Sequence, residues 1–164
     1  MQIDAKGLTY VYNQKSPFAS KALDGVDLTI REGEFFGIIG HTGSGKSTFV
    51  QHLNALIKVT GGSLKIGDYD LADKKCNFLE LRSKVGMVFQ YPEYQLFAET
   101  VEKDVAFGLK NFRKEIKDEK EIAAHVQEAL ETVGLNYAAV KDRSPFELSG
   151  GQKRRVAIAG VIVT

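Results

Sequence analysis

The sequence "EFFGIIGHTGSGKS" (Glu34 to Ser47) joins a run of apolar residues to a glycine-rich loop. The apolar part, Glu34 to Gly40, is continuous and ends at a glycine, which is typical of a strand buried on both faces. Beyond Gly45, apolar residues recur at helical spacing, at Phe49, Val50, Leu53, Leu56 and Ile57. A strand, a tight loop and a helix in this order predict an α/β fold.

The loop itself matches the pattern G-x-x-x-x-G-K-[ST] of phosphate-binding loops, in the strand–loop–helix context that this pattern requires. Its glycines allow backbone N–H groups to surround an anion, and the helix start adds the positive end of its dipole. Lys46 would reach the β- and γ-phosphates of ATP, Ser47 would hold Mg²⁺, and Thr48 would contact the α-phosphate. The predicted ATP-binding residues of the loop are Gly40, His41, Thr42, Gly43, Ser44, Gly45, Lys46, Ser47 and Thr48.

The competing interpretation of this loop is a dinucleotide-binding turn. Such a turn needs G-x-G-x-x-G, whereas Gly40 to Gly45 read G-x-x-G-x-G. Lys46 and Ser47 would also have no role in it. We therefore set this interpretation aside.

Composition is that of an ordinary globular domain, with 164 residues, 43% hydrophobic and 26% charged. A net charge of +1 predicts no special affinity for nucleic acid or anionic lipid. The single cysteine, Cys76, offers neither a disulfide framework nor a CxxC metal site. The N-terminus lacks a signal-peptide pattern, and the longest apolar stretch, Val156 to Val163, is far shorter than the roughly 20 residues that cross a bilayer. Any membrane role is therefore expected to come through a partner.

Secondary-structure patterns divide the chain into a strand-rich start and a helical continuation. "LTYVY" (Leu8 to Tyr12) and "VDLTI" (Val26 to Ile30) alternate as strands do, and "TGGSLKI" predicts a turn and a short strand. "VGMVFQ" (Val85 to Gln90) predicts another buried strand. The polar, mostly helical region that follows has an apolar stripe at Ile122, Val126, Ala129, Leu130 and Val133.

A second motif, "LSGGQ", precedes a basic and then apolar run. Ser149 is suited to cap a helix that begins near Gly150, and bare glycine N–H groups at a helix start bind phosphate. With the phosphate loop, this motif resembles the signature of ATP-binding cassette (ABC) ATPases. The resemblance implies that it acts in trans, closing over the γ-phosphate held by a second subunit; its residues are Leu148, Ser149, Gly150, Gly151 and Gln152. The alternative is a capped loop without a ligand.

The resemblance covers essentially the whole chain and implies an α/β P-loop NTPase core with an N-terminal antiparallel β subdomain and a helical signature subdomain. We expect one domain, 1–164, made of a nucleotide-binding core at 1–90, a helical subdomain at 91–147, and the signature motif with the start of its helix at 148–164. The domain would be incomplete at its C-terminal end.

Two further positions match the family's pattern. By resemblance, Gln90 contacts Mg²⁺ and the attacking water and senses the transmembrane partner. Tyr12 matches the aromatic residue that stacks on adenine, with Tyr10 and Phe18 as nearby alternatives and simple packing as another. The implied catalytic residues are Lys46 and Gln90, and the implied Mg²⁺ ligands are Ser47 and Gln90.

"YPEYQLFAETVEKDVAFGLKN" (Tyr91 to Asn111) resembles the ATPase subunits of energy-coupling factor transporters, which import vitamins and transition-metal ions. The resemblance implies a peripheral protein at the cytoplasmic face of the cell membrane, with no nucleic-acid partner. Its partners would be an identical or paralogous ATPase subunit, a transmembrane coupling subunit and a substrate-binding membrane subunit. Tyr91 to Phe97 would lie near the coupling subunit; alternatively, these aromatic residues form the core of the subdomain.

The family places a strand ending in Asp-Glu after the signature helix, and this sequence ends at Thr164 before such a strand. "KDEKE" (Lys117 to Glu121) is no substitute, since it is expected to be a solvated charge run at a helix start. We therefore expect the general-base glutamate to be absent and hydrolysis by these 164 residues alone to be negligible. An apolar face beside Glu34 to Gly40 would also be left open.

Two alternatives to a transport ATPase remain. One is a nucleotide-binding interaction module that does not hydrolyse ATP. The other is a cassette ATPase of DNA repair or translation, which long coiled-coil insertions or a tandem cassette would support; this sequence has neither.

One group of side chains is expected not to bind nucleic acid, and another not to bind a metal ion. Lys153, Arg154 and Arg155 predict a solvated helix face rather than a nucleic-acid site. The histidines lack metal-ligand spacing, and we expect them to be ordinary loop or surface residues; they are His41, His52 and His125.

Overall fold

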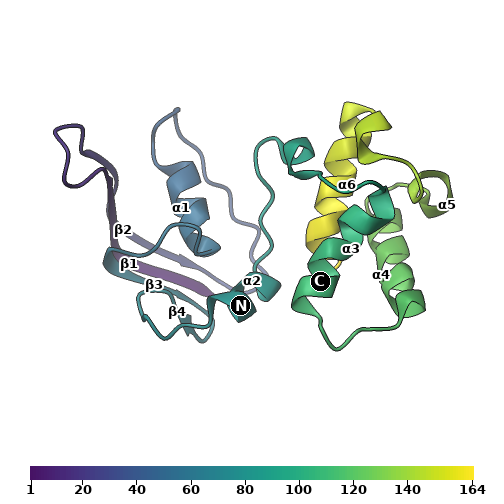
Figure 1. The fold of residues 1–164 in the computed structure, drawn as a ribbon. Helices are drawn as coiled ribbons and strands as arrows, with labels where there is room; N and C mark the ends of the chain where they lie inside the picture. Colours follow the sequence, from purple (N-terminus) through teal and green to yellow (C-terminus); the bar gives the residue numbers. More distant parts are fainter. The chain divides into compact units, whose positions relative to one another are not determined.

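The computed structural model describes all residues, 1–164, as two compact units, Met1–Val85 and Gly86–Thr164 (Figure 1). The first unit contains β1 (Ile3–Tyr12), β2 (Ser20–Ile30), α1 (Lys46–Leu53), β3 (Gly61–Ile66), β4 (Tyr69–Asp70) and α2 (Phe78–Lys84). The second contains the 3₁₀ turn η1 (Pro92–Gln95), α3 (Val101–Phe112), α4 (Glu119–Thr132), α5 (Tyr137–Val140), the 3₁₀ turn η2 (Pro145–Glu147) and α6 (Gly150–Ile162). The chain thus divides after Val85, whereas the sequence suggested a boundary after Gln90.

The sheet of the first unit is wholly antiparallel, with strand order β2-β1-β3-β4. In β3 the buried Leu64 and Ile66 flank the exposed Lys65, which is the alternation of a strand with one covered face. The core of this unit joins the sheet to Phe49 of α1 and Leu81 of α2. The strands predicted at 8–12, at 26–30 and after the glycine pair at 61–62 are confirmed, the first two with longer bounds.

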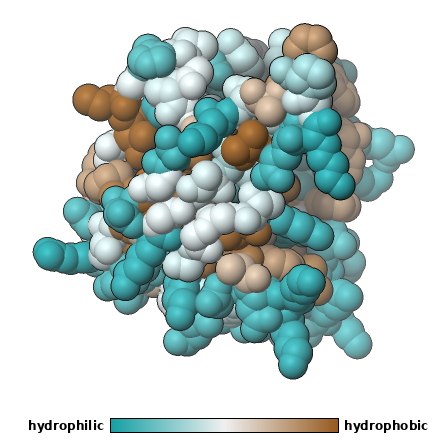
Figure 2. Space-filling model, turned by 90° about the vertical axis from the view of Figure 1, so that its left-hand side faces the viewer, coloured by the Kyte–Doolittle hydropathy of each residue, from teal (hydrophilic) through white to brown (hydrophobic).

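The strands predicted at Glu34–Gly40 and Val85–Gln90 are wrong, because neither run pairs with another segment. Phe35 and Ile39 are almost fully exposed. A strand buried on both faces needs hydrogen-bonded neighbours along its edges and a layer on each face, and residues 1–164 provide neither for these runs. Apolar groups accordingly interrupt the hydrophilic surface of the protein, as they do on the face shown in Figure 2.

The helix predicted from Gly45 onward is shorter than its apolar pattern. α1 ends at Leu53, and the backbone N–H groups of Leu56 and Ile57 both donate to the carbonyl of Gln51 outside the helix. Ala55 has a positive φ of 52°, which interrupts the helical path. The apolar residues at helical spacing therefore extend beyond Leu53, where the helix itself ends.

The second unit is a helical assembly, as predicted for residues 91–147. Its helices have side-chain N-caps: Thr100 accepts from Lys103 N–H, and Asp118 accepts from Lys120 N–H. The stripe on α4 faces the core, with Ile122, Val126, Ala129 and Leu130 buried and Val133 packed against them. The core brings these residues together with Val156, Ala157 and Ala159 of α6. None of the helices combines the length and apolar character that a membrane span requires.

Candidate functional site

The loop between Gly40 and Lys46 ends at an uncapped helix start. Gly45 occupies the N-cap of α1 with φ 88°, a left-handed conformation that glycine adopts without strain, and no side chain caps the helix. A β-carbon at Gly45 would lie 2.4 Å from the carbonyl oxygen of Ala22. The loop therefore passes close to β2, and the N–H groups of the first turn of α1 are available to an external acceptor.

Lys46 places an unpaired positive charge over this loop. Its Nζ donates to the carbonyl oxygens of Gly40 and His41, both at 2.8 Å, and to Ser44 Oγ at 3.2 Å. All three acceptors are neutral, and no carboxylate forms an ion pair with Lys46. An ammonium group beside free helix N–H groups is suited to bind an anion.

The residues that follow the loop connect it to β1. Tyr12 Oη and Thr48 Oγ1 are hydrogen-bonded at 3.2 Å, so Tyr12 lies beside the second residue after Lys46. The ring of Tyr12 meets that of Tyr10 edge-on at 4.8 Å, and Tyr10 meets the ring of His52 edge-on at 5.0 Å. The structure therefore brings Tyr12 and Thr48 together with Tyr10, the alternative adenine-stacking residue, and with His52, for which no site role was expected.

The expectation that His52 is a loop or surface residue is wrong. His52 lies in α1 with none of its surface exposed, because it shares a helix face with Thr48 four residues earlier and that face packs against β1. Its Nδ1 lies 2.7 Å from the carbonyl oxygen of Thr48, so Nδ1 carries the proton that it donates there. Nε2 is then an unprotonated, buried atom without a partner. The i, i+4 spacing from Thr48 was the sequence signal that could have identified this residue.

Burial lowers the pKa of His52 from its ordinary 6.5, with the hydrogen bond to Thr48 opposing the shift. The unfolded chain therefore binds a proton at a higher pH than the folded protein does. The free energy of unfolding is expected to be highest above pH 6.5 and to fall as the pH drops below that value. Urea unfolding at about pH 7.5 and about pH 5.5 measures this loss. The His52→Phe variant, which cannot titrate, should lose less stability over this interval; equal losses in both proteins would contradict the assignment.

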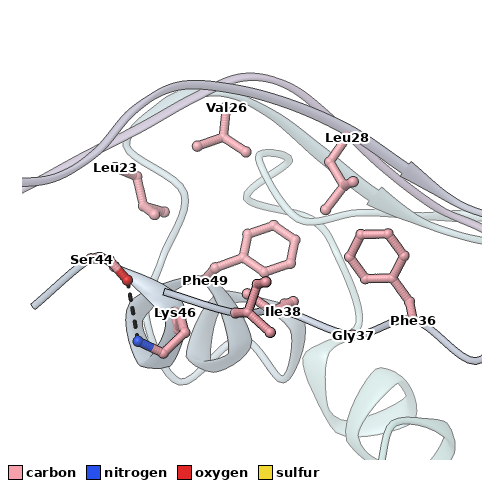
Figure 3. A pocket seen from close by; sticks show the side chains of 11 residues that line it. Leu23, Val26, Leu28, Phe36, Gly37, Ile38, Ser44, Lys46 and Phe49 are labelled. Carbon is pink, nitrogen blue, oxygen red and sulfur yellow. Dashed lines mark hydrogen bonds between the residues drawn. The ribbon is translucent and has the colours of Figure 1, made fainter. Parts of the chain in front are cut away.

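A separate hollow of about 410 Å³ lies between β2 and α1 (Figure 3). Leu23, Val26 and Leu28 of β2 point towards Phe49 across it, and the unpaired run around Phe36 to Ile39 forms another wall. Only Ser44 and Lys46 bring polar side chains to it. The hollow is thus an apolar space beside the loop, open where the run at Glu34–Gly40 lacks strand neighbours.

In the second unit, the LSGGQ segment is a capped helix start. Ser149 Oγ accepts from Gln152 N–H at 3.3 Å, and Gln152 Oε1 accepts from Ser149 N–H at 3.0 Å, forming a reciprocal capping box. Leu148 is buried and anchors the segment, whereas Gly150 and Gly151 are exposed with open space around their missing β-carbons. The helix predicted to begin near Gly150 is confirmed.

The aromatic residues after Gln90 do not form the core of this unit, so that alternative is wrong. Gln90 itself is exposed, as are Tyr91, Tyr94 at 84% and Phe97. Leu96 instead points inward. Asp104 of α3 fixes the backbone of this segment, because its Oδ2 accepts hydrogen bonds from the N–H groups of residues 97 and 98, both at 2.8 Å.

The basic triplet after LSGGQ is only partly a solvated face. Arg154 pairs with Glu93 of η1 at 3.3 Å, and Arg155 donates to the carbonyl of Gly134 at 2.9 Å. The Arg154 guanidinium contributes, after a backbone hydrogen bond, to lowering the pKa of Glu93. Two of the three side chains therefore have partners within the unit. The charge run at Lys117–Glu121 lies at the start of α4, as expected.

Comparison with known proteins finds relatives over nearly the whole chain. The ABC transporter family profile matches residues 23–164. The chain is 58% identical over 162 residues to the energy-coupling factor transporter ATP-binding protein EcfA2 of Clostridioides difficile, and 56% identical over 162 residues to the protein of that name in Clostridium tetani. These matches cover 99% of this chain and 55% of each relative, so the chain spans about half the length of the curated relatives it matches.

Solved structures agree with this assignment. One is a dimeric, post-hydrolysis state of an ATP-binding cassette bound to ADP and Pi, with a TM-score of 0.87 and 31% identity over 98% of this chain and 69% of that one. Another is cbiO1 of Clostridium perfringens, part of the ABC transporter complex cbiONQ, with a TM-score of 0.81 and 36% identity over 98% of this chain and 61% of that one. The predicted α/β fold of ABC ATPases is thereby confirmed. With the profile extending over most of its length, the chain belongs to the ABC transporter family.

Proposed function

We propose that this chain is the ATP-binding part of an ATPase subunit of an energy-coupling factor importer, which couples ATP hydrolysis to uptake of a vitamin or a transition-metal ion. The observation that carries the proposal is the unpaired ammonium group of Lys46 over a loop that leads into an uncapped helix. Such an arrangement favours a polyphosphate, because the charge and the free N–H groups act on the same anion. The named relatives support the transport class.

Within the first unit, each residue of the site has a proposed role. Lys46 would bind the β- and γ-phosphates, and backbone N–H groups of residues 40–48 would surround the phosphate chain. Thr48 would contact the α-phosphate, and its hydroxyl partner Tyr12 would stack on adenine. Because Tyr12 and Thr48 are hydrogen-bonded to each other, the base and the α-phosphate would be held at a fixed separation.

Mg²⁺ is compatible with the donors present. The structure contains no group of three or more His, Cys, Asp or Glu side chains that could hold a metal ion. Ser47 offers one exposed hydroxyl next to Lys46, and Mg²⁺ commonly uses one or two protein ligands together with phosphate oxygens and water. Ser47 would therefore hold the ion jointly with ATP, and Gln90 would supply an amide oxygen and contact the attacking water.

The LSGGQ segment would act on the nucleotide of a second ATPase subunit. Its exposed glycines present a helix start without side chains, which is suited to approach a γ-phosphate closely. The exposed aromatic residues Tyr91, Tyr94 and Phe97 would contact a transmembrane coupling subunit, and a further membrane subunit would bind the transported substrate. The protein would then lie at the cytoplasmic face of the membrane.

Equilibrium dialysis of the whole gene product against ATP and Mg²⁺ tests this proposal. Lys46→Ala is expected to weaken binding about 30-fold, since a charge-assisted hydrogen bond contributes roughly 1.5–3 kcal/mol. Lys58→Ala, which removes an exposed lysine of the same unit, should leave binding unchanged. Failure of the unaltered protein to retain ATP, or equal effects of the two substitutions, would refute nucleotide binding at this loop.

A further inference from the structure

We infer that His52 is a positioning residue that fixes the base-contacting Tyr12 relative to the phosphate-contacting Thr48, and thereby sets the preference for ATP over a bare triphosphate chain. The inference rests on the proposed nucleotide site and adds to it a residue that touches neither base nor phosphate. No role in this site follows from the sequence motifs for His52.

The first support is a closed ring of four contacts, two of which join α1 to β1. His52 Nδ1 donates to the backbone carbonyl of Thr48 at 2.7 Å, and Thr48 Oγ1 is hydrogen-bonded to Tyr12 Oη at 3.2 Å. On the other side, the rings of His52 and Tyr10 meet edge-on at 5.0 Å, and those of Tyr10 and Tyr12 at 4.8 Å. His52 therefore contacts both residues that touch Tyr12: it donates to the carbonyl of Thr48, and its ring meets that of Tyr10.

The second support is the chemistry of a histidine at this place. The side chain is completely buried, and its Nε2 has no hydrogen-bond partner. A buried, unsatisfied acceptor is unfavourable, so an apolar ring of similar size would be at least as good for packing. What such a ring would lack is the donor that holds the Thr48 carbonyl. The protonated Nδ1 is thus the feature that distinguishes histidine here.

Under this inference, the base and the phosphate chain of a nucleotide depend on different contacts. Backbone N–H groups and Lys46 bind the phosphate chain without help from β1. Tyr12 lies on β1, and its place relative to Thr48 is maintained by the ring of contacts that closes through His52. Loss of this restraint should therefore weaken recognition of the base and leave recognition of the phosphates intact.

The experiment measures the affinities of the whole gene product for ATP and for tripolyphosphate, both with Mg²⁺, by equilibrium dialysis. His52→Phe keeps a ring against Tyr10 and removes the hydrogen-bond donor. It is expected to weaken ATP binding about fivefold, because base stacking is a modest part of the total affinity. Tripolyphosphate binding should change less than about twofold. His52→Asn can donate from the same backbone position and should recover part of the ATP affinity. His125→Phe, on α4, is the matched control and should change neither ligand.

The melting temperature of each variant shows whether a loss of affinity comes from the position of Tyr12 or from loss of stability. His52→Phe should melt no lower than the unaltered protein at neutral pH, because it removes an unsatisfied polar atom. An equal loss of affinity for ATP and tripolyphosphate, or no change in their ratio in either His52 variant, would overturn the inference while leaving the proposed function standing. Failure of the unaltered protein to bind ATP would instead overturn the proposed function, and the inference with it.

Discussion

Gly45→Ala is expected to destabilise the first unit by about 3–5 kcal/mol and to abolish ATP binding. Two costs combine at this position. An alanine would have to adopt φ 88°, and its β-carbon would lie 2.4 Å from the backbone carbonyl of Ala22 and 3.1 Å from Leu23 Cδ2. The nearest atom belongs to the backbone of β2, so the strain can be relieved only by moving the loop, which would displace Lys46.

Gly43→Ala separates these two costs. Gly43 lies in the same loop with φ 84°, but nothing lies within 4 Å of the β-carbon it would gain. Only the left-handed conformation is then penalised, at about 1–2 kcal/mol. Urea unfolding monitored by circular dichroism measures both variants. Equal destabilisation by the two substitutions would show that the close approach of Gly45 to β2 does not control the loop.

Gly151→Ala is expected to have opposite effects on stability and function. The added methyl group meets no atom within 4 Å, and alanine favours a helix over glycine, so α6 should gain about 0.5–1 kcal/mol. The same methyl group would cover a helix start that is proposed to approach the γ-phosphate of a second subunit. ATP-dependent association of two subunits is therefore expected to weaken about 100-fold, which corresponds to roughly 2.7 kcal/mol.

Gly160→Ala is the matched control for this prediction. It lies in the same helix, and its β-carbon would meet Val105 Cα at 3.9 Å, an ordinary contact. The substitution should stabilise α6 in a similar way and leave association unchanged. Sedimentation of the whole gene product, with and without ATP, measures this association. Association of the Gly151→Ala protein as strong as that of Gly160→Ala would contradict a role for the bare glycine surface.

Much of the local structure around the proposed site was predictable because its signals lie within short segments. The glycine-rich loop at residues 40–47 and the cap at Ser149 depend on neighbours within a few residues, so local sequence patterns predict both. The exposure of Tyr91, Tyr94 and Phe97 was left open, since an aromatic residue serves equally well in a core or at an interface. The burial of His52 was missed because its pattern, one polar residue on a helix face, is also that of a surface residue.

Local sequence predicted where α1 and α6 begin and where the glycine-rich loop lies, because a helix satisfies its hydrogen bonds within one segment and glycine tolerates a left-handed backbone. Whether an apolar run forms a strand, and whether a polar side chain is buried, could be learned only from the folded protein. Glu34–Gly40 has the composition of a strand but no strand beside it, and His52 is buried because β1 packs against its helix face. Both outcomes depend on segments distant in sequence, whose presence no local pattern can report.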